Sequence, residues 1–120
     1  MTRSIVLNFE GTEVPVTLND TETACAFYEK LPVSIEVSGT GIDFCGRMPF
    51  ELPYLHEQVG RGWRNGDVNY NPGGGWFAVL YADEENSLRY GDQVNIGRID
   101  GPVDAVSSLH GTFNLRIEKA

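Results

Sequence analysis

Few side chains in this sequence are spaced for acid–base, nucleophilic or metal chemistry. His56 and His110 lie far apart, and no HxH or HxxxH spacing pairs them for a metal. No GxSxG motif occurs, and Ser107-Ser108 have no catalytic partner nearby in the sequence. Glu84-Glu85 lie in a polar stretch typical of a solvated loop, and Gly73-Gly74-Gly75 precede an apolar run rather than a helix. We therefore expect a turn there rather than a phosphate loop, and we predict no metal site and no cofactor.

The cysteines and the N-terminal residues indicate the compartment. Cys25 and Cys45 are too few and too far apart for a zinc site or a CxxC redox pair. Residues 1–10 alternate like a strand and contain no long apolar core of a signal peptide, and no apolar run approaches the ~18 residues that span a bilayer. The sequence therefore predicts a cytoplasmic protein with two reduced, partly buried thiols.

The charge balance limits the partners that we expect. The 120 residues hold 9 Lys and Arg against 17 Asp and Glu, for a net charge of −8, and no basic run occurs. Binding to nucleic acid or to an anionic membrane needs clustered positive charge, so we expect neither. The length fits a single domain over residues 1–120. The 14 glycines fall between apolar runs, which predicts many turns and many strands.

Three aromatic residues flank the two strongest turn signals, Asn65-Gly66 and the segment 72–75. These residues are Trp63, Tyr70 and Trp76. Aromatic side chains at the mouth of a barrel can form a shelf for a ligand, or they can plug the end of the barrel. Both interpretations stay open at this point.

Trp63 has two arginines beside it. Arg61 and Arg64 are the only concentration of positive charge in the chain, and they predict partial exposure of Trp63. The pair could attract a small anionic molecule, or it could belong to a solvated loop.

Alternation of apolar and polar residues predicts eight strands. They cover residues 4–9, 14–18, 33–37, 42–48, 67–71, 76–82, 94–99 and 112–117. Pro15 has no N–H to donate, so we expect the second strand to lie at an edge or to carry a bulge. The run 76–82 is continuously apolar, which predicts a strand covered on both faces.

Two helices complete the prediction. Residues 22–31 follow the capping side chains of 19–21, carry one apolar face and end at Pro32, and a second helix covers 102–109. The segment 49–62 is irregular, with a short helical turn at most, and 83–91 is a polar loop. This many short strands at regular spacing favours a closed barrel, which leaves no open edge.

An ordered set of motifs carries a family resemblance. In chain order they are TACAFYEKLPVSIEVS at 23–38, MPFELPY at 48–54, Gly66-Asp67, Tyr70-Asn71-Pro72-Gly73, the apolar strand 76–81 and NIGRID at 95–100. This order resembles the bacterial and archaeal cyclophilin-like family of small proteins of unassigned function. The resemblance covers about residues 4–118. It implies an all-β fold, a closed eight-stranded cyclophilin-like β-barrel with a short helix at either end.

A fold of this type suggests prolyl isomerase activity. Such an enzyme must lower a rotational barrier of about 18–20 kcal/mol. An isomerase twists the imide in a dry apolar pocket beside an arginine. The FHR-type strand and the Gln-Gly-Gly-Asp stretch of true cyclophilins are missing from this sequence. The nearest analogue is FCGRMPF at 44–50, in which Arg47 is a weak candidate catalytic residue and Phe44, Met48 and Phe50 are candidate pocket walls. Alternatively, Arg47 is a surface strand residue and the other three belong to the core.

The function predicted is that of a non-catalytic barrel that binds a small molecule or a short peptide. The candidate ligand-binding residues are Phe44, Arg47, Met48, Phe50, Trp63 and Tyr70. Two alternatives stay open: a weak peptidyl-prolyl isomerase that uses Arg47, and a protein-interaction subunit that docks a partner on an exposed edge. We expect a monomer or a homodimer.

Overall fold

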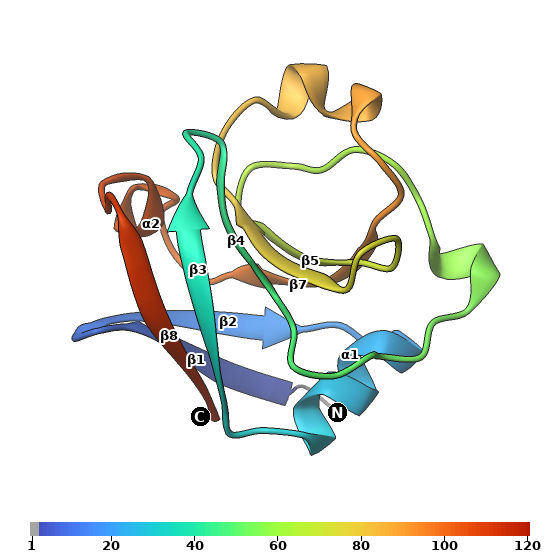
Figure 1. The fold of residues 1–120 in the computed structure, drawn as a ribbon, viewed down its shortest axis with the longest axis horizontal. Helices are drawn as coiled ribbons and strands as arrows, with labels where there is room; N and C mark the ends of the chain where they lie inside the picture. Colours follow the sequence, from blue (N-terminus) through green and yellow to red (C-terminus); the bar gives the residue numbers. More distant parts are fainter. Residues whose placement is uncertain (1–2) are drawn as a thin grey trace.

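Eight antiparallel strands close into a barrel in the computed structural model, which describes residues 3–120 (Figure 1). The strands are β1 (Arg3–Phe9), β2 (Thr12–Leu18), β3 (Val33–Gly39), β4 (Asp43–Arg47), β5 (Asp67–Asn71), β6 (Trp76–Leu80), β7 (Val94–Ile99) and β8 (Thr112–Lys119). Their order around the barrel is β1-β2-β7-β5-β6-β4-β3-β8. The predicted all-β closed barrel is confirmed. Every described strand has a neighbour on both sides, but β3 pairs with β4 only through Ser38 and Gly39, and β2 pairs with β7 only through Val16–Leu18.

The expectation for Pro15 is wrong. β2 pairs with β1 in continuous register, without a bulge, and it also pairs with β7 through Val16–Leu18. The carbonyl of Pro15 accepts a hydrogen bond from the N–H of Asp100 at 2.8 Å. The N–H and C=O of one strand residue point to the same side, so the N–H that proline lacks would point just past the end of the β7 ladder. A proline at this position therefore leaves the ladder intact.

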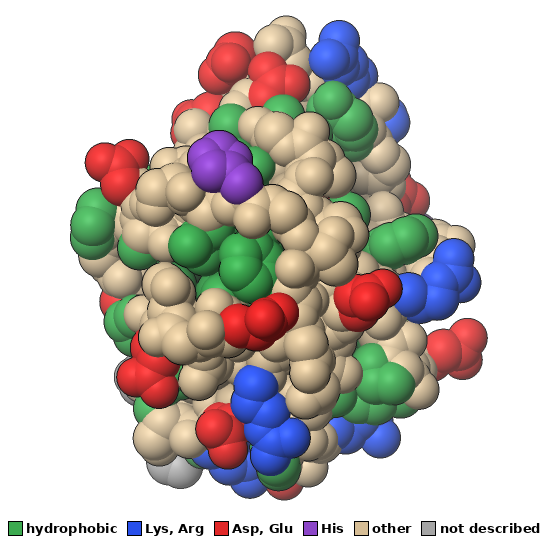
Figure 2. Space-filling view, turned by 60° about the vertical axis from the view of Figure 1, so that its left-hand side comes forward, with side chains coloured by type: hydrophobic (Ala, Val, Ile, Leu, Met, Phe, Trp, Pro, Cys, Tyr) green, Lys and Arg blue, Asp and Glu red, His purple; other side chains and the backbone are tan. Residues whose placement is uncertain are grey.

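Charged side chains are dispersed over the barrel surface. On the face drawn in Figure 2, acidic and basic side chains are interspersed and no continuous basic surface is visible. Within residues 3–120, no helix is long and apolar enough to cross a membrane.

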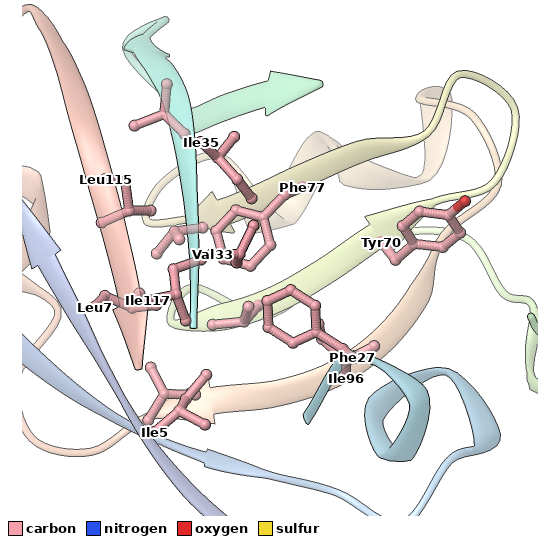
Figure 3. Close-up of a cluster of buried hydrophobic side chains, with 14 of the residues drawn as sticks. Ile5, Leu7, Phe27, Val33, Ile35, Tyr70, Phe77, Ile96, Leu115 and Ile117 are labelled. Carbon is pink, nitrogen blue, oxygen red and sulfur yellow. The ribbon is translucent and has the colours of Figure 1, made fainter. Parts of the chain in front are cut away.

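The core fills the barrel from the inward faces of the strands (Figure 3). Its aliphatic centre is drawn from β1, β3, β7 and β8, and fully buried members include Ile5, Leu7, Ile96, Leu115 and Ile117. Tyr70 is also buried, but Figure 3 shows its ring apart from the aliphatic cluster, with the hydroxyl pointing away from it. The inward faces of all strands thus form one continuous hydrophobic cluster.

Two short α-helices lie on opposite sides of the barrel (Figure 1). In α1 (Glu22–Glu29), the Thr21 hydroxyl accepts from the Ala24 N–H at 3.1 Å, as expected for an N-cap. Phe27 is fully buried and its ring stacks on that of Phe77, with centroids 5.7 Å apart. The second helix, α2 (Asp104–Ser107), is shorter than the predicted segment 102–109. Both predicted helices therefore exist, and α1 closes one end of the core.

Two 3₁₀ helices lie in the long connections. η1 (His56–Gln58) is the short helical turn expected within 49–62. η2 (Glu84–Arg89) occupies the segment that was predicted to be a polar loop. The segments 60–66 and 84–92 pass over the outside of β6, where Ala78 and Leu80 are buried against Trp63. This second, smaller cluster explains why the β6 sequence is apolar on both faces.

Candidate functional site on the outer face of β4 and β6

The strand register brings three pairs of outward-facing side chains together across β4 and β6. Strand side chains alternate between faces, so every second residue of each strand points away from the core. The outward pairs are Arg47 with Trp76, Cys45 with Ala78, and Asp43 with Leu80. These pairs form a strip of mixed apolar and polar character on the outside of the barrel.

A hollow of about 340 Å³ lies over this strip, and we call it the aromatic hollow. Cys45 on β4 and Ala78 and Leu80 on β6 form the floor of this hollow. Three aromatic side chains stand around it: Trp63, Trp76 and Tyr90. The other lining residues are Thr40, Ile42, Asp43, Asn71, Gly91 and Gln93. The arrangement is concave and apolar with a few polar groups, as is typical of sites for small molecules.

Trp63 is fixed in place, and the expectation that it is partly exposed is wrong. Its exposed fraction is 7%, because the ring packs on Ala78 and Leu80 outside the barrel. The indole N–H donates to the Ala82 carbonyl at 2.9 Å, and the ring centroid lies 5.1 Å from that of Tyr90. One wall of the aromatic hollow is therefore rigid before any ligand arrives.

The two arginines near Trp63 are not among the residues that line the aromatic hollow. The guanidinium of Arg61 donates to the Tyr90 carbonyl at 2.9 Å and 3.2 Å. Arg61 and Arg64 line a shallow depression elsewhere on the surface, together with Glu84 and Asp67. The neighbouring carboxylates oppose the capture of a small anion at this pair.

Asp43 and Cys45 give the aromatic hollow its titratable groups. The Thr40 hydroxyl donates to the Asp43 carboxylate at 2.5 Å, while burial raises the pKa of Asp43. Burial, followed by the nearby charge of Asp43, raises the pKa of Cys45 to about 11. A thiol with this pKa stays protonated at neutral pH, so Cys45 is a poor nucleophile.

A chain of side-chain amides ends at the wall of the aromatic hollow. The NH₂ of Asn19 donates to the side-chain oxygen of Asn95 at 3.1 Å, that of Asn95 donates to Asn69 at 2.9 Å, and that of Asn69 donates to Gln93 at 2.6 Å. The Gln93 oxygen is therefore engaged, and its NH₂ group is left to donate. This NH₂ belongs to a residue that lines the aromatic hollow, where it is suited to a carbonyl or hydroxyl of a ligand.

A second hollow of about 400 Å³, which we call the loop hollow, lies beside the turn 72–75. Four of the six candidate binding residues line it: Arg47, Met48, Phe50 and Tyr70. Tyr70 is buried, and its hydroxyl accepts from the Leu52 N–H at 3.3 Å. Met48 is 6% exposed, and Phe50 is half-buried, with the Lys30 ammonium 5.1 Å from its ring centroid.

The remaining two candidates lie elsewhere. Phe44 is fully buried inside the barrel, where its ring makes edge contacts with Phe9 and Phe113 at 5.4 Å and 5.6 Å. It has no surface for a ligand to touch, so the expectation that it forms a pocket wall with Arg47 is wrong. Trp63 lines the aromatic hollow instead. The six candidates therefore do not converge on one site.

Trp63 is the one candidate binding residue that lines the aromatic hollow, and the functional residues missed from the sequence include Asp43, Cys45, Tyr90 and Gln93. One signal could have directed attention to them. A barrel strand that is apolar on both faces, such as 76–82, must be covered from outside as well as from inside. The polar segments that supply this cover carry no hydrophobic pattern of their own.

Histidines do not contribute a metal centre within residues 3–120. No group of three or more His, Cys, Asp or Glu side chains there is placed to hold a metal ion. His56 lies at the start of η1, and His110 is followed by a glycine with φ of 104° at the turn into β8.

Comparison with known proteins identifies the family of this barrel. The model of the cyclophilin-like family matches residues 7–118. The chain belongs to the cyclophilin-like family. The family expected from the motifs is thus confirmed over nearly the whole length of this cyclophilin-like protein.

A solved structure shares the fold. The solution structure of a hypothetical protein from Archaeoglobus fulgidus superimposes with a TM-score of 0.76 at 18% sequence identity, over 99% of this chain and 95% of the other. At that identity the likeness shows the fold alone. No curated protein matches this cyclophilin-like chain.

Proposed function

We propose that this cyclophilin-like protein binds a small molecule, or the apolar side chain of a short peptide, in the aromatic hollow without transforming it. The observation that carries the proposal is the concave lining of the aromatic hollow, in which Cys45, Ala78 and Leu80 lie between the rings of Trp63, Trp76 and Tyr90. A volume of about 340 Å³ lies within the range of small-molecule sites, about 300–1,000 Å³.

The polar groups of the aromatic hollow fit recognition better than catalysis. The Gln93 NH₂ group can donate to a ligand, and the Asp43 carboxylate can accept. The one nucleophilic atom on the floor is the Cys45 sulfur, whose pKa of about 11 keeps it protonated. The described lining of the aromatic hollow therefore has the means to orient a ligand and contains no activated group with which to attack it. A cytoplasmic location, a monomeric or homodimeric state and a lack of affinity for nucleic acid and membranes remain predictions.

The two tryptophans of the chain make the proposal directly testable. Both Trp63 and Trp76 line the aromatic hollow, so energy transfer from tryptophan reports a probe bound there. We would titrate the protein with prodan, an uncharged naphthalene dye whose emission shifts to the blue in apolar surroundings. We expect a saturable blue shift with tryptophan quenching in the parent protein.

Ala78→Phe supplies the decisive variant, because a ring at the floor position fills the hollow. Ser34→Phe supplies the matched control, since Ser34 is an exposed residue of β3 that pairs with Arg116 of β8 and does not line the aromatic hollow. Loss of prodan binding in Ala78→Phe and its retention in Ser34→Phe would support the proposal. Absence of binding to the parent, or equal binding to Ala78→Phe, would overturn it.

Prolyl isomerisation remains a second candidate, on the observation that Arg47, Met48 and Phe50 line one hollow. A protease-coupled assay with a proline tetrapeptide at high protein concentration tests it. Arg47→Ala would be compared with Arg116→Ala, which removes another exposed arginine from β8. A rate above background that is lost only in Arg47→Ala would favour the isomerase, and a rate equal to background would exclude it.

A further inference from the structure

We propose that the aromatic hollow selects a small organic ammonium ion, an amine with an apolar body, whose cationic head lies beside Asp43. This inference rests on the proposed function and names the class of ligand. The occupant to which it commits is a free small molecule.

The charges of the aromatic hollow favour a cation. Asp43 is the one charged residue among the described residues that line it, and no Lys, Arg or His is part of this lining. The whole chain carries a net charge of −8, so its general field also attracts cations. An anionic ligand would face an uncompensated carboxylate at short range.

The Asp43 carboxylate lacks a cationic partner. Its hydrogen-bonding partners are the Thr40 hydroxyl at 2.5 Å and the Cys45 thiol, both uncharged, and within residues 3–120 no ion pair joins it to a lysine, arginine or histidine. A partly buried carboxylate is costly unless it is paired. Burial raises the pKa of Asp43, as expected for a carboxylate that no cation compensates. A bound ammonium would supply the missing partner.

The aromatic walls supply the second part of the recognition. The faces of indole and phenol rings attract cations, most strongly when water is excluded. Two wall rings already interact with cations in this protein: the Arg47 guanidinium lies 5.1 Å from the Trp76 ring centroid, and that of Arg89 lies 5.4 Å from the Tyr90 ring centroid. Neither arginine lines the aromatic hollow, whereas Trp76 and Tyr90 both do.

The apolar floor completes the match. Ala78 and Leu80 offer no hydrogen-bonding side chain, so the ligand needs an aliphatic or aromatic body to cover them. An inorganic cation or free ammonium would make no use of this apolar lining. The three features together therefore specify a cationic head on an apolar body rather than a cation alone.

Three ligands with the same phenyl body test the inference. They are 2-phenylethylamine, which is protonated at neutral pH, 2-phenylethanol, which is neutral, and 3-phenylpropanoate, which is anionic. Intrinsic tryptophan fluorescence reports binding, because both tryptophans line the hollow. Protection of Cys45 from iodoacetamide locates the ligand, with Cys25 on α1 as the internal reference.

We expect the amine to bind about tenfold more tightly than the alcohol, equivalent to roughly 1.4 kcal/mol, and the carboxylate to bind more weakly than both. Asp43→Asn should remove the preference for the amine while preserving the shape of the hollow. Asp100→Asn is the matched control, because Asp100 also accepts from a threonine hydroxyl, that of Thr17 at 2.9 Å, and does not line the hollow. It should keep the preference.

The outcomes separate this inference from the proposed function. Equal or tighter binding of the alcohol, or failure of all three ligands while prodan binds, would overturn the ammonium inference and leave the binding site standing. An amine preference that persists in Asp43→Asn would also overturn it. Failure of prodan itself would instead remove the proposed function. The three-ligand comparison uses the parent protein, so it decides the matter even if a variant fails to fold.

Discussion

Arg47 and Trp76 face each other across β4 and β6, with the guanidinium carbon 5.1 Å from the centroid of the indole ring. The pair forms the boundary between the two hollows, since Trp76 lines the aromatic hollow and Arg47 lines the loop hollow. A cross-strand register thus determines that the one cationic candidate residue stands outside the apolar site.

The Arg47–Trp76 contact should make a small, measurable contribution to stability. Exposed cation–π pairs contribute about 0.5–1 kcal/mol, and Trp76 is 37% exposed. We expect a coupling free energy of about 0.5 kcal/mol from a double-mutant cycle of Arg47→Ala and Trp76→Ala, measured by urea unfolding. A coupling indistinguishable from zero would show that the contact does not stabilise the folded state.

Cys45 should be unusually slow to react with alkylating reagents. Its pKa of about 11 leaves little thiolate at neutral pH, and the charge of Asp43 is the second cause of this shift after burial. Asp43→Asn should lower the pKa and accelerate alkylation of Cys45 several-fold, because the rate follows the thiolate fraction. Mass spectrometry after timed iodoacetamide treatment gives both rates in one sample, with Cys25 as the reference. An unchanged Cys45 rate in Asp43→Asn would contradict the electrostatic cause.

Asp43 should make stability depend on pH in a definite direction. Burial raises its pKa in the folded state above the ordinary value of 3.8, so the folded protein takes up this proton at a higher pH than the unfolded chain does. The free energy of unfolding, taken relative to that of Asp43→Asn, should therefore increase as the pH falls through the raised pKa. This additional stability should disappear as the pH rises above that pKa. Urea unfolding of both proteins at several pH values measures this difference. Asp100→Asn corrects for the loss of one negative charge, and an opposite slope would refute the assignment.

Gly46 should tolerate no side chain. A Cβ built on Gly46 would lie 2.0 Å from the carbonyl oxygen of Glu36, which is backbone and cannot move aside alone. We expect Gly46→Ala to destabilise the protein by at least about 1–3 kcal/mol, as overpacking does in general. Gly60→Ala is the control, since a Cβ there meets nothing within 4 Å, and it should be neutral or slightly stabilising. If both variants unfolded at the same urea concentration, the prediction would be wrong, and β3 and β4 would be able to move apart around the added methyl group without a loss of stability.

Local sequence patterns were sufficient to predict most of the strands and helices. β5 and β7 have the predicted bounds, 67–71 and 94–99, because turn residues bracket their apolar patterns. Thr21 caps α1 as expected, since a threonine hydroxyl before a helix satisfies an amide that has no intrahelical partner. Alternation within 42–48 also separates two of the candidate residues. Phe44 and Arg47 lie three positions apart, so a strand must point them to opposite faces.

The sequence by itself determined the closed barrel, its family and the inward face of nearly every strand, because these depend on local periodicity and on motifs in order. It also predicted a strand covered on both faces at 76–82, and the structure shows this cover for residues 77–80 of β6. Only the tertiary structure decided what covers the outer face. Trp63 and Tyr90 come from polar segments on either side of β5 and β6, and they meet over Ala78 and Leu80. Their meeting depends on long-range contacts such as the bond from the Trp63 indole to the Ala82 carbonyl, and no local periodicity encodes such contacts.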